Sequence, residues 1–433
     1  RKLYVRKIHE RVNFVMSCKQ PKGWKNIVNM EQYFVEYTTS SNALMICLLP
    51  FKFTGYEKSD VTILRCMGMA SMNGILTNRE FKNNWWEIIP MLIGIVVLFT
   101  TVSCQLTSMY PISSDQFEYV LELFPFALSG VVSTIKLIRL FTYRSRFYHF
   151  LQQIKIIWES GRLKNILTSS ILKRAERTRL MTSYYTSLIA FFGPESNSSY
   201  DFSATVFPCI YPIKIDSYPK YFMLITFEQI DVTIACTAWA SCDTLFAQLS
   251  THVSLQFMVI ANDVKEIINN CGNLGNNPES IEKLRDIVNR YQQLFLFCES
   301  IESFFSPVIF ATVISNAINL CCGMYRLDQE INAGNWNGVT TQAVYITSVS
   351  LQTVVFCIFS ETLTESSTIM GEAIYHSQWT DCDQNMKIKL LLIMVRSRKQ
   401  FICTAYNIID VNYNQLKQIA NAAVSYFMLL RSL

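Results

Sequence analysis

The chain has 433 residues, of which 50% are hydrophobic and only 16% are charged, and its mean hydropathy is +0.21. A soluble domain usually carries about 25% charged residues, so this composition favours one polytopic membrane bundle over two or three soluble domains. The net charge of +5 is too small to indicate a nucleic-acid partner.

Seven stretches are apolar enough to cross a bilayer, which takes about 20 residues for a helix. In chain order they are 86–110, 117–141, 178–193, 218–242, 302–322, 340–361 and 408–430. The third is short and rich in Tyr, so we expect it to continue a helix from the preceding loop. The run "NALMICLLPF" (42–51) is too short to span, and we expect it to be interfacial or re-entrant.

The basic residues are distributed unevenly between these spans. Segments 1–85, 142–177, 261–298 and 364–407 hold 30 of the 38 Lys and Arg residues, whereas the alternate loops and the C-terminal end hold four. Basic residues stay on the cytoplasmic side of a membrane, so the N-terminus is predicted to be cytoplasmic and the C-terminus extracellular. The only N-x-[ST] sequon, at Asn197, lies in a loop assigned outside, where it can be glycosylated.

This topology divides the chain into four regions. Residues 1–85 form a cytoplasmic N-terminal region with the interfacial segment, and 86–362 hold the first six spans, with long inner helices expected at 142–177 and 261–298. The run "IEKLRDIVNRYQQLFLF" repeats apolar residues at three and four positions, which predicts a helix, and "NNCGNLGNNPES" predicts a loop before it. Residues 363–407 form a cytoplasmic anchor segment, and 408–433 form the seventh span.

Motifs of enzymes and metal sites are missing from the sequence. There is no Walker lysine loop, GxGxxG, HExxH or GxSxG, and the four His residues lack ligand spacing. We therefore expect no enzymatic activity, cofactor or metal. The 14 Cys residues form no CxxC pair, so a disulfide framework is not expected. Only Cys209, Cys321 and Cys322 fall near an oxidising face, and the sequence leaves open whether one disulfide forms there.

A motif near the C-terminus carries a family resemblance. The stretch "FCIFSETLTESSTIMGEAIYHSQW" (356–379) resembles the insect odorant receptor signature "FC.F...L...S.....AAY...W", with matching positions at Glu365, Ser366, Ala373, Tyr375 and Trp379. Segments 242–257, 390–405 and 424–430 also resemble parts of this family, 390–405 being similar to its amphipathic cytosolic helix.

The sequence also departs from the family and from its relatives. Ile374 stands where the signature has a second Ala. No Gln-Phe follows Tyr426, which favours the odorant branch over the related gustatory receptors. Segment 261–298 is too short for the insert of the shared co-receptor, which favours an odorant-specific subunit.

The resemblance implies a ligand-gated, nonselective cation channel in the plasma membrane of olfactory sensory neurons. Four subunits would surround one pore lined by the last helix, and the inner helices would form an anchor layer. The ligand would be a small volatile odorant. The partners would be the co-receptor in a heterotetramer, or further copies of this chain in a homotetramer, together with membrane lipid.

Polar residues recur along the last span at helical spacing. Asn414, Lys417, Asn421 and Ser425 share one face, which continues to Leu429 and Ser432. A lysine at mid-depth costs ~2.5–3.5 kcal/mol unless it meets water or a partner. We interpret the face as a pore lining, in which Ser425 and Ser432 contact water and Leu429 and Leu433 form a hydrophobic constriction. The alternative is a helix contact within one subunit.

The outer halves of several spans hold aromatic and small polar residues, which suit an odorant pocket. Packing or lipid contact is an equal alternative for each. The candidates are Tyr119, Leu123, Phe126, Tyr184, Ser187, Leu188, Phe191, Phe222, Phe227, Tyr345 and Ser348.

Other residues have predicted roles outside the pocket. Glu228 and Asp231 lie within a span, where they either tune the pocket or the ion path or form a structural pair. Asp243 and His252 are expected to anchor the inner helices. Tyr375 and Trp379 are expected to transmit motion or pack at an interface.

Two other functions are alternatives, and the sequence disfavours both. A secondary transporter would require internal repeats or paired broken helices, and the sequence has neither. A receptor coupling to G proteins is opposed by the charge pattern and by the lack of DRY and NPxxY motifs.

Overall fold

The computed structural model describes residues 85–110, 117–159, 217–274 and 278–432, together with 205, 207 and 209–211. This part is α-helical apart from one short hairpin, which confirms the predicted all-α membrane class. Five described helices contain stretches long and apolar enough to cross a bilayer. The predicted third span (178–193), the run 42–51 and Asn197 lie outside the described residues.

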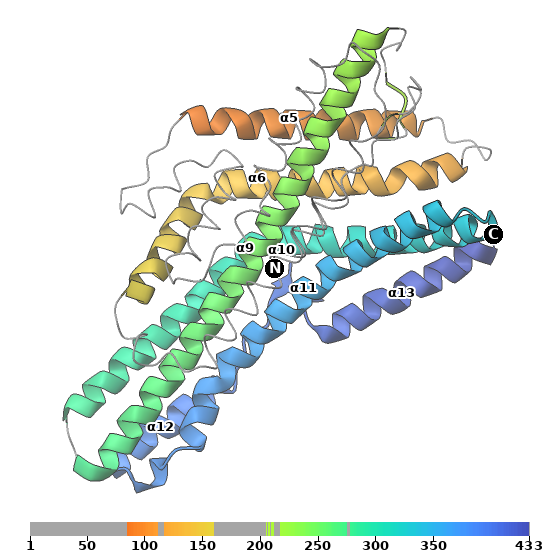
Figure 1. Cartoon of the computed structure of the whole chain (residues 1–433). Coiled ribbons are helices and arrows are strands. Elements are labelled where there is room, and N and C mark those ends of the chain that lie inside the picture. The colour runs from red at the N-terminus through yellow and green to blue at the C-terminus, as the bar shows by residue number, and fades with distance from the viewer. Residues whose placement is uncertain are drawn as a thin grey trace, which may run out of the picture. The chain divides into compact units, whose positions relative to one another are not determined.

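Most of these helices run further than the predicted spans, but the first ends at Ser108, before the predicted residue 110 (Figure 1). They are α5 (Trp85–Ser108), α6 (Phe117–Glu159), α9 (Tyr218–Leu274), α10 (Pro278–Asn332) and α11 (Trp336–Tyr375). Spans and inner helices that were predicted separately are continuous, since amphipathic periodicity extends a helix beyond the apolar stretch that hydropathy detects. The loop predicted at 269–280 was too long, because α9 continues to Leu274 and α10 already begins at Pro278.

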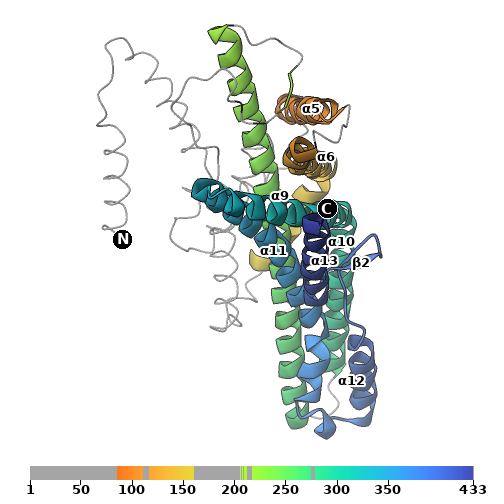
Figure 2. The same cartoon turned by 90° about the vertical axis from the view of Figure 1, so that its right-hand side faces the viewer.

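The core lies where α9, α10 and α11 pack side by side, as both views show (Figures 1 and 2). Phe246 of α9 is completely buried, and its ring centroid lies 5.0 Å from that of Phe305 on α10 and 5.1 Å from that of Phe356 on α11. Aromatic pairs at this separation add about 0.5–1.5 kcal/mol each beyond the burial of their area.

A tight turn joins α10 to α11. Gly334 follows α10 with φ +69°, a left-handed conformation that glycine adopts without steric cost. Asn335 then caps α11, where its side-chain oxygen accepts a hydrogen bond of 3.3 Å from the backbone N–H of Gly338.

Pro307 lies inside α10 and cannot donate to the carbonyl of Ser303 four residues earlier. Arg139 of α6 satisfies this carbonyl instead, with its Nη2 donating to the Ser303 oxygen at 2.7 Å and to the Phe304 oxygen at 3.2 Å. The guanidinium also stacks 4.3 Å from the ring centroid of Tyr143. The arginine within this span therefore completes the hydrogen bonding of an interrupted helix.

Replacing Arg139 with Met is expected to destabilise the protein by about 1–3 kcal/mol, because the Ser303 carbonyl loses its donor. The cost should shrink in the Pro307→Ala background, where residue 307 regains its own N–H. A double-mutant cycle on the thermal unfolding of the purified protein measures this coupling. Equal costs of Arg139→Met in both backgrounds would contradict the pairing.

The last part of the chain differs from the sequence prediction. The amphipathic helix expected at 390–405 is α12 (Gln384–Ser397), so its predicted bounds were wrong. A hairpin of β1 (Thr404–Ala405) and β2 (Ile409–Asp410) follows it, and the last helix α13 (Tyr413–Ser432) begins later than the predicted 408. Tyr406 and Asn407, both at φ 55°, form the turn of this hairpin.

The hairpin is fixed to α10 beside the proline. Glu302 accepts hydrogen bonds from the backbone N–H of Thr404 at 2.9 Å and from its hydroxyl, and Ser306 accepts one from the N–H of Tyr406 at 2.6 Å. Since the hairpin leads directly into α13, these hydrogen bonds connect α10 to the start of the last helix.

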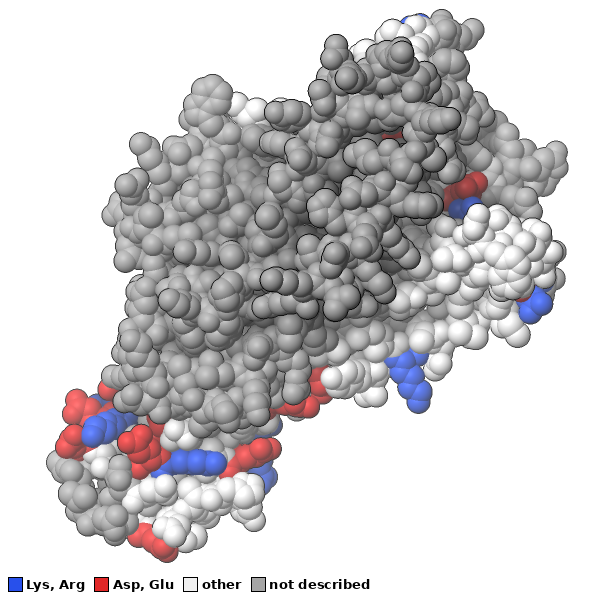
Figure 3. All heavy atoms as spheres, in the orientation of Figure 1, with Lys and Arg blue, Asp and Glu red and all other residues white. Residues whose placement is uncertain are grey.

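The surface is consistent with a membrane band. Charged side chains gather at the end where α9 ends, α10 begins and α12 lies, whereas the visible surface along α11 and α13 is mostly uncharged (Figure 3). Lipid-facing helices require such an uncharged surface.

Candidate functional site

The predicted pocket residues of α6 lie at the end of the helix that faces α5. Leu123 is completely buried and packs with Met109 and Ala127, and Tyr119 packs against this cluster. Phe126 is more exposed, and its ring makes an edge-to-face contact with Phe207, with centroids 5.8 Å apart. This end of α6 is therefore aromatic, as an apolar ligand site requires.

The segment before α9 covers this cluster and is held by Glu228. Tyr211 donates its hydroxyl to the buried Glu228 carboxylate, and the N–H of Phe207 lies 3.4 Å from the same oxygen. Burial raises the pKa of the neighbouring Cys209 thiol to about 11, so the thiol stays protonated at neutral pH. These contacts favour the structural role among those predicted for Glu228.

Tyr345 of α11 lies against α10 at Gly323, where an added Cβ would meet its ring at 3.5 Å. Its hydroxyl is buried beside Ser129 of α6 without a well-formed hydrogen bond. A buried hydroxyl that is poorly paired costs free energy. The hydroxyl of Ser348, by contrast, already donates a hydrogen bond of 3.0 Å to the carbonyl of Val344 in the same helix.

The remaining pocket candidates are not brought together by the described contacts. Phe222 is 55% exposed, and neither it nor Phe227 belongs to an apolar cluster. Tyr184, Ser187, Leu188 and Phe191 lie outside the described residues.

The stripe of polar residues on α13 is exposed in the single chain. Asn414, Lys417, Asn421 and Ser425 are all on the surface, and Leu429 is 57% exposed. The opposite face, with Ile419 and Ala423, is buried, and α13 packs mainly on α10. The helix thus has one face against its own subunit and another open to water or a partner. The side chains of Ser432 and Leu433 are outside the described set.

Asp243 lies inside the bundle, where its Oδ1 is 2.6 Å from Nζ of Lys136 and both side chains are completely buried. Its Oδ2 accepts a hydrogen bond from Gln352 at 2.7 Å, and Asn316 donates to Gln352 at 3.1 Å. Helices α6, α9, α10 and α11 therefore meet at one polar network. The sequence does not show which residue pairs with Lys136, because the two partners are more than 100 positions apart. A lysine within an apolar span does indicate that a carboxylate lies near it in the fold.

The other predicted anchor residues lie elsewhere. His252 is half-buried on α9. Tyr375 is 69% exposed at the end of α11, and Trp379 packs against the core from the short 3-10 helix η4 (Trp379–Asp381). Among the described cysteines, Cys209, Cys321 and Cys322 are all free thiols.

Five described helices long and apolar enough to cross a bilayer, with a buried polar network between four of them, define a polytopic membrane protein. The family model for the 7tm Odorant receptor matches residues 116–424. The chain therefore belongs to the odorant receptor family, whose members are receptors and not enzymes.

Individual relatives agree with this assignment. Odorant receptor 13a of Drosophila melanogaster is 23% identical over 330 residues, which cover 70% of this chain and 77% of that protein. Odorant receptor 47a of the same species is 24% identical, and its match covers 52% of this chain and 58% of that protein. The solved structure of the olfactory receptor OR5 from Machilis hrabei in complex with eugenol matches with a TM-score of 0.71 and 15% identity, covering 87% of this chain and 97% of that one. This likeness shows the shared fold.

Proposed function

We propose that the chain is a subunit of an odorant-gated, nonselective cation channel in the plasma membrane of olfactory sensory neurons. The observation that carries the proposal is the exposed polar stripe of α13, which is the face that a pore-lining helix needs. In an assembly of four subunits these stripes would surround one water-filled path. Leu429 and Leu433 would narrow it at the end where the chain finishes.

The orientation in the membrane follows from charge. With the N-terminus cytoplasmic and the C-terminus extracellular, 30 of 38 basic residues lie inside and Asn197 lies outside. The ends of α9 and α11, together with α12, then form the cytosolic layer through which subunits assemble, with the exposed Tyr375 at its surface and Trp379 packed against its core.

The ligand would be a small, mostly apolar volatile, bound between α6, α9, α11 and residues 178–193. Tyr119, Leu123, Phe126, Phe222 and Phe227 would supply apolar surface, and Tyr345 and Ser348 would supply hydrogen-bonding groups. The corresponding contributions of Tyr184, Ser187, Leu188 and Phe191 belong to the same proposal.

Replacing Tyr345 with Phe is expected to raise the half-maximal concentration of an odorant that carries a hydroxyl or carbonyl group by about 2–10-fold. The reason is that a hydrogen bond to such a group contributes about 0.5–1.5 kcal/mol. Dose–response curves of odorant-evoked current measure the effect. The control is Thr347→Val, which removes an exposed hydroxyl two positions further along the same helix, and an equal shift in both variants would contradict the pocket.

Currents in oocytes test the channel directly. The chain is expressed alone or together with the co-receptor, and uninjected oocytes serve as the control. A panel of volatile odorants is applied to each. We expect inward cation current only when the chain is present. Current from the chain alone would indicate a homotetramer, and current that also needs the co-receptor would indicate a heterotetramer. Uptake of a solute without current would contradict the channel.

A further inference from the structure

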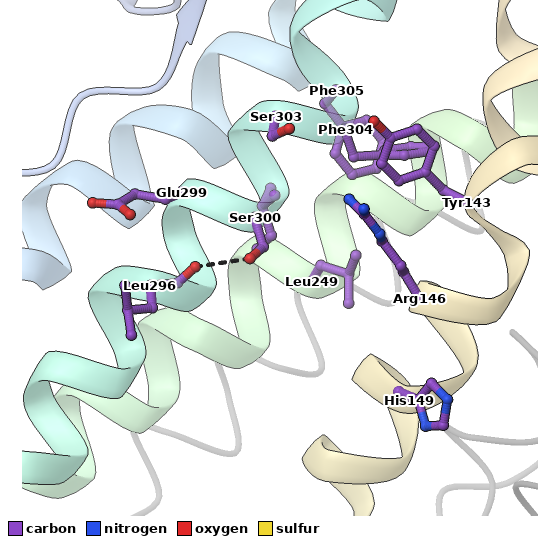
Figure 4. Close-up of a pocket in the computed structure, with 11 residues that line it drawn as sticks. Tyr143, Arg146, His149, Leu249, Leu296, Glu299, Ser300, Ser303, Phe304 and Phe305 are labelled. Carbon is purple, nitrogen blue, oxygen red and sulfur yellow. Dashed lines mark hydrogen bonds between the residues drawn. The ribbon is translucent and has the colours of Figure 1, made fainter.

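A cavity lined by none of the proposed odorant-binding residues lies between α6, α9 and α10 (Figure 4). Its volume is about 490 Å³, which is within the range of sites for small molecules. Its lining has two parts. Tyr143, Arg146 and His149 come from the later half of α6, and seven residues of α10 between Leu296 and Phe305 face them, with Leu249 of α9 between them.

The charge of this cavity is mainly positive. Arg146 extends from α6 toward α10, with its guanidinium 5.0 Å from the ring centroid of Tyr143, and it has no ion pair among the described residues (Figure 4). Arg139 lies beside the cavity and donates to carbonyl groups, which leave its charge uncompensated. Glu299 is the one carboxylate in the lining, and in Figure 4 it points away from Arg146.

The other part of the lining is apolar. Leu249, Phe304 and Phe305 lie deep in the lining and are at most 3% exposed, whereas Leu296 offers an apolar surface that is 62% exposed. Ser303 adds an exposed hydroxyl next to the aromatic rings. A cationic opening above an apolar wall fits a molecule with an anionic head and a hydrocarbon chain.

The position along the helix agrees with such a molecule. Arg146 is the last residue of the apolar stretch Tyr119–Arg146, so it lies where a span reaches the headgroups of the bilayer. Basic pockets between membrane helices on the cytoplasmic side are known settings for anionic lipid headgroups. We propose that this cavity binds an anionic phospholipid, with its phosphate at Arg146 and an acyl chain along Leu249 and Phe304.

The lipid would contact the part of α10 that positions the last helix. Ser303 and Phe304 face the cavity, and on the same turns Glu302 and Ser306 hold the hairpin that leads into α13. Bound lipid would therefore stabilise one position of this turn. The site is independent of the proposed odorant pocket and does not require that the chain conducts ions.

Lipid retention tests the proposal. The full chain is purified after equilibration in bilayers of phosphatidylcholine and phosphatidylglycerol in equal amounts, and the retained lipids are measured by mass spectrometry. The wild type is expected to enrich phosphatidylglycerol, and Arg146→Gln to reduce that enrichment about fivefold, since one arginine near the membrane surface contributes about that factor. Arg146→Lys, which keeps the charge, should retain most of it.

Two further variants make the result specific. Arg285→Gln removes an equally exposed arginine of α10 outside the cavity and should leave retention unchanged. Ser303→Trp obstructs the cavity at an exposed position without changing charge and should reduce retention. Equal retention in the wild type, Arg146→Gln and Ser303→Trp would overturn the proposal. Displacement of the lipid by soluble glycerol phosphate would overturn it too, because the acyl chain would then contribute nothing.

Discussion

Replacing Asp243 with Leu is expected to lower the free energy of unfolding by about 3–5 kcal/mol. The substitution leaves the ammonium group of Lys136 completely buried without its carboxylate, and Gln352 loses an acceptor. A charge that is stranded within a helix bundle is far more costly than the pair is stabilising. The loss is measured by thermal unfolding of the purified protein, with size-exclusion chromatography as the readout of the folded fraction.

The double variant Lys136→Met with Asp243→Leu separates the two effects. It removes both charges, so most of the stability should return even though the ion pair is gone. The matched control is Lys283→Met, which breaks an ion pair of 2.8 Å whose side chains are 61% and 64% exposed, and it should leave the free energy of unfolding nearly unchanged. A double variant as unstable as Asp243→Leu alone would contradict this account of the network.

Replacing Leu429 with Ser is expected to increase the current without odorant about tenfold. A hydrophobic constriction closes by excluding water, and a polar residue at the narrowest point admits water into the closed pore. The apolar contact of one leucine is worth about 1.5–3 kcal/mol, and 1.4 kcal/mol already changes an equilibrium tenfold. Basal conductance, normalised to surface expression, is the measurement.

The control for this substitution is Val424→Ser on the flank of the same helix, where the side chain is exposed to a similar extent. It should leave the basal current unchanged. A leak of equal size in both variants would indicate general loosening of α13, and no leak in Leu429→Ser would place the gate elsewhere.

Hydropathy predicted five of the described spans because apolar length is a local property of the chain, whereas α13, the predicted seventh span, is not among the described helices that are apolar enough by this measure. The ends of the helices were not predictable in the same way. In α6 and α9 the residues beyond the apolar stretch continue the helix by packing on neighbours, which hydropathy does not record. The hairpin before α13 was missed because only two residues pair on each side, and its stability comes from Glu302 and Ser306 on α10.

The functional sites also fall into those that local sequence predicts and those that depend on contacts between distant residues. The stripe on α13 follows from helical spacing alone, and the structure leaves it exposed. The pairing of Lys136 with Asp243 and the capping of the Ser303 carbonyl by Arg139 depend on contacts between distant parts of the chain. The cavity at Arg146 likewise depends on three helices, so no single segment of the sequence indicates it.

The central claim is that the polar stripe of α13 lines an odorant-gated pore. The most direct measurement places cysteine at Ser425 on the stripe, or at Ala423 on the buried face, and applies a charged thiol reagent during odorant-evoked current. Modification of Ser425→Cys should block the current, and Ala423→Cys should be insensitive. Block at Ala423→Cys with none at Ser425→Cys would contradict the account.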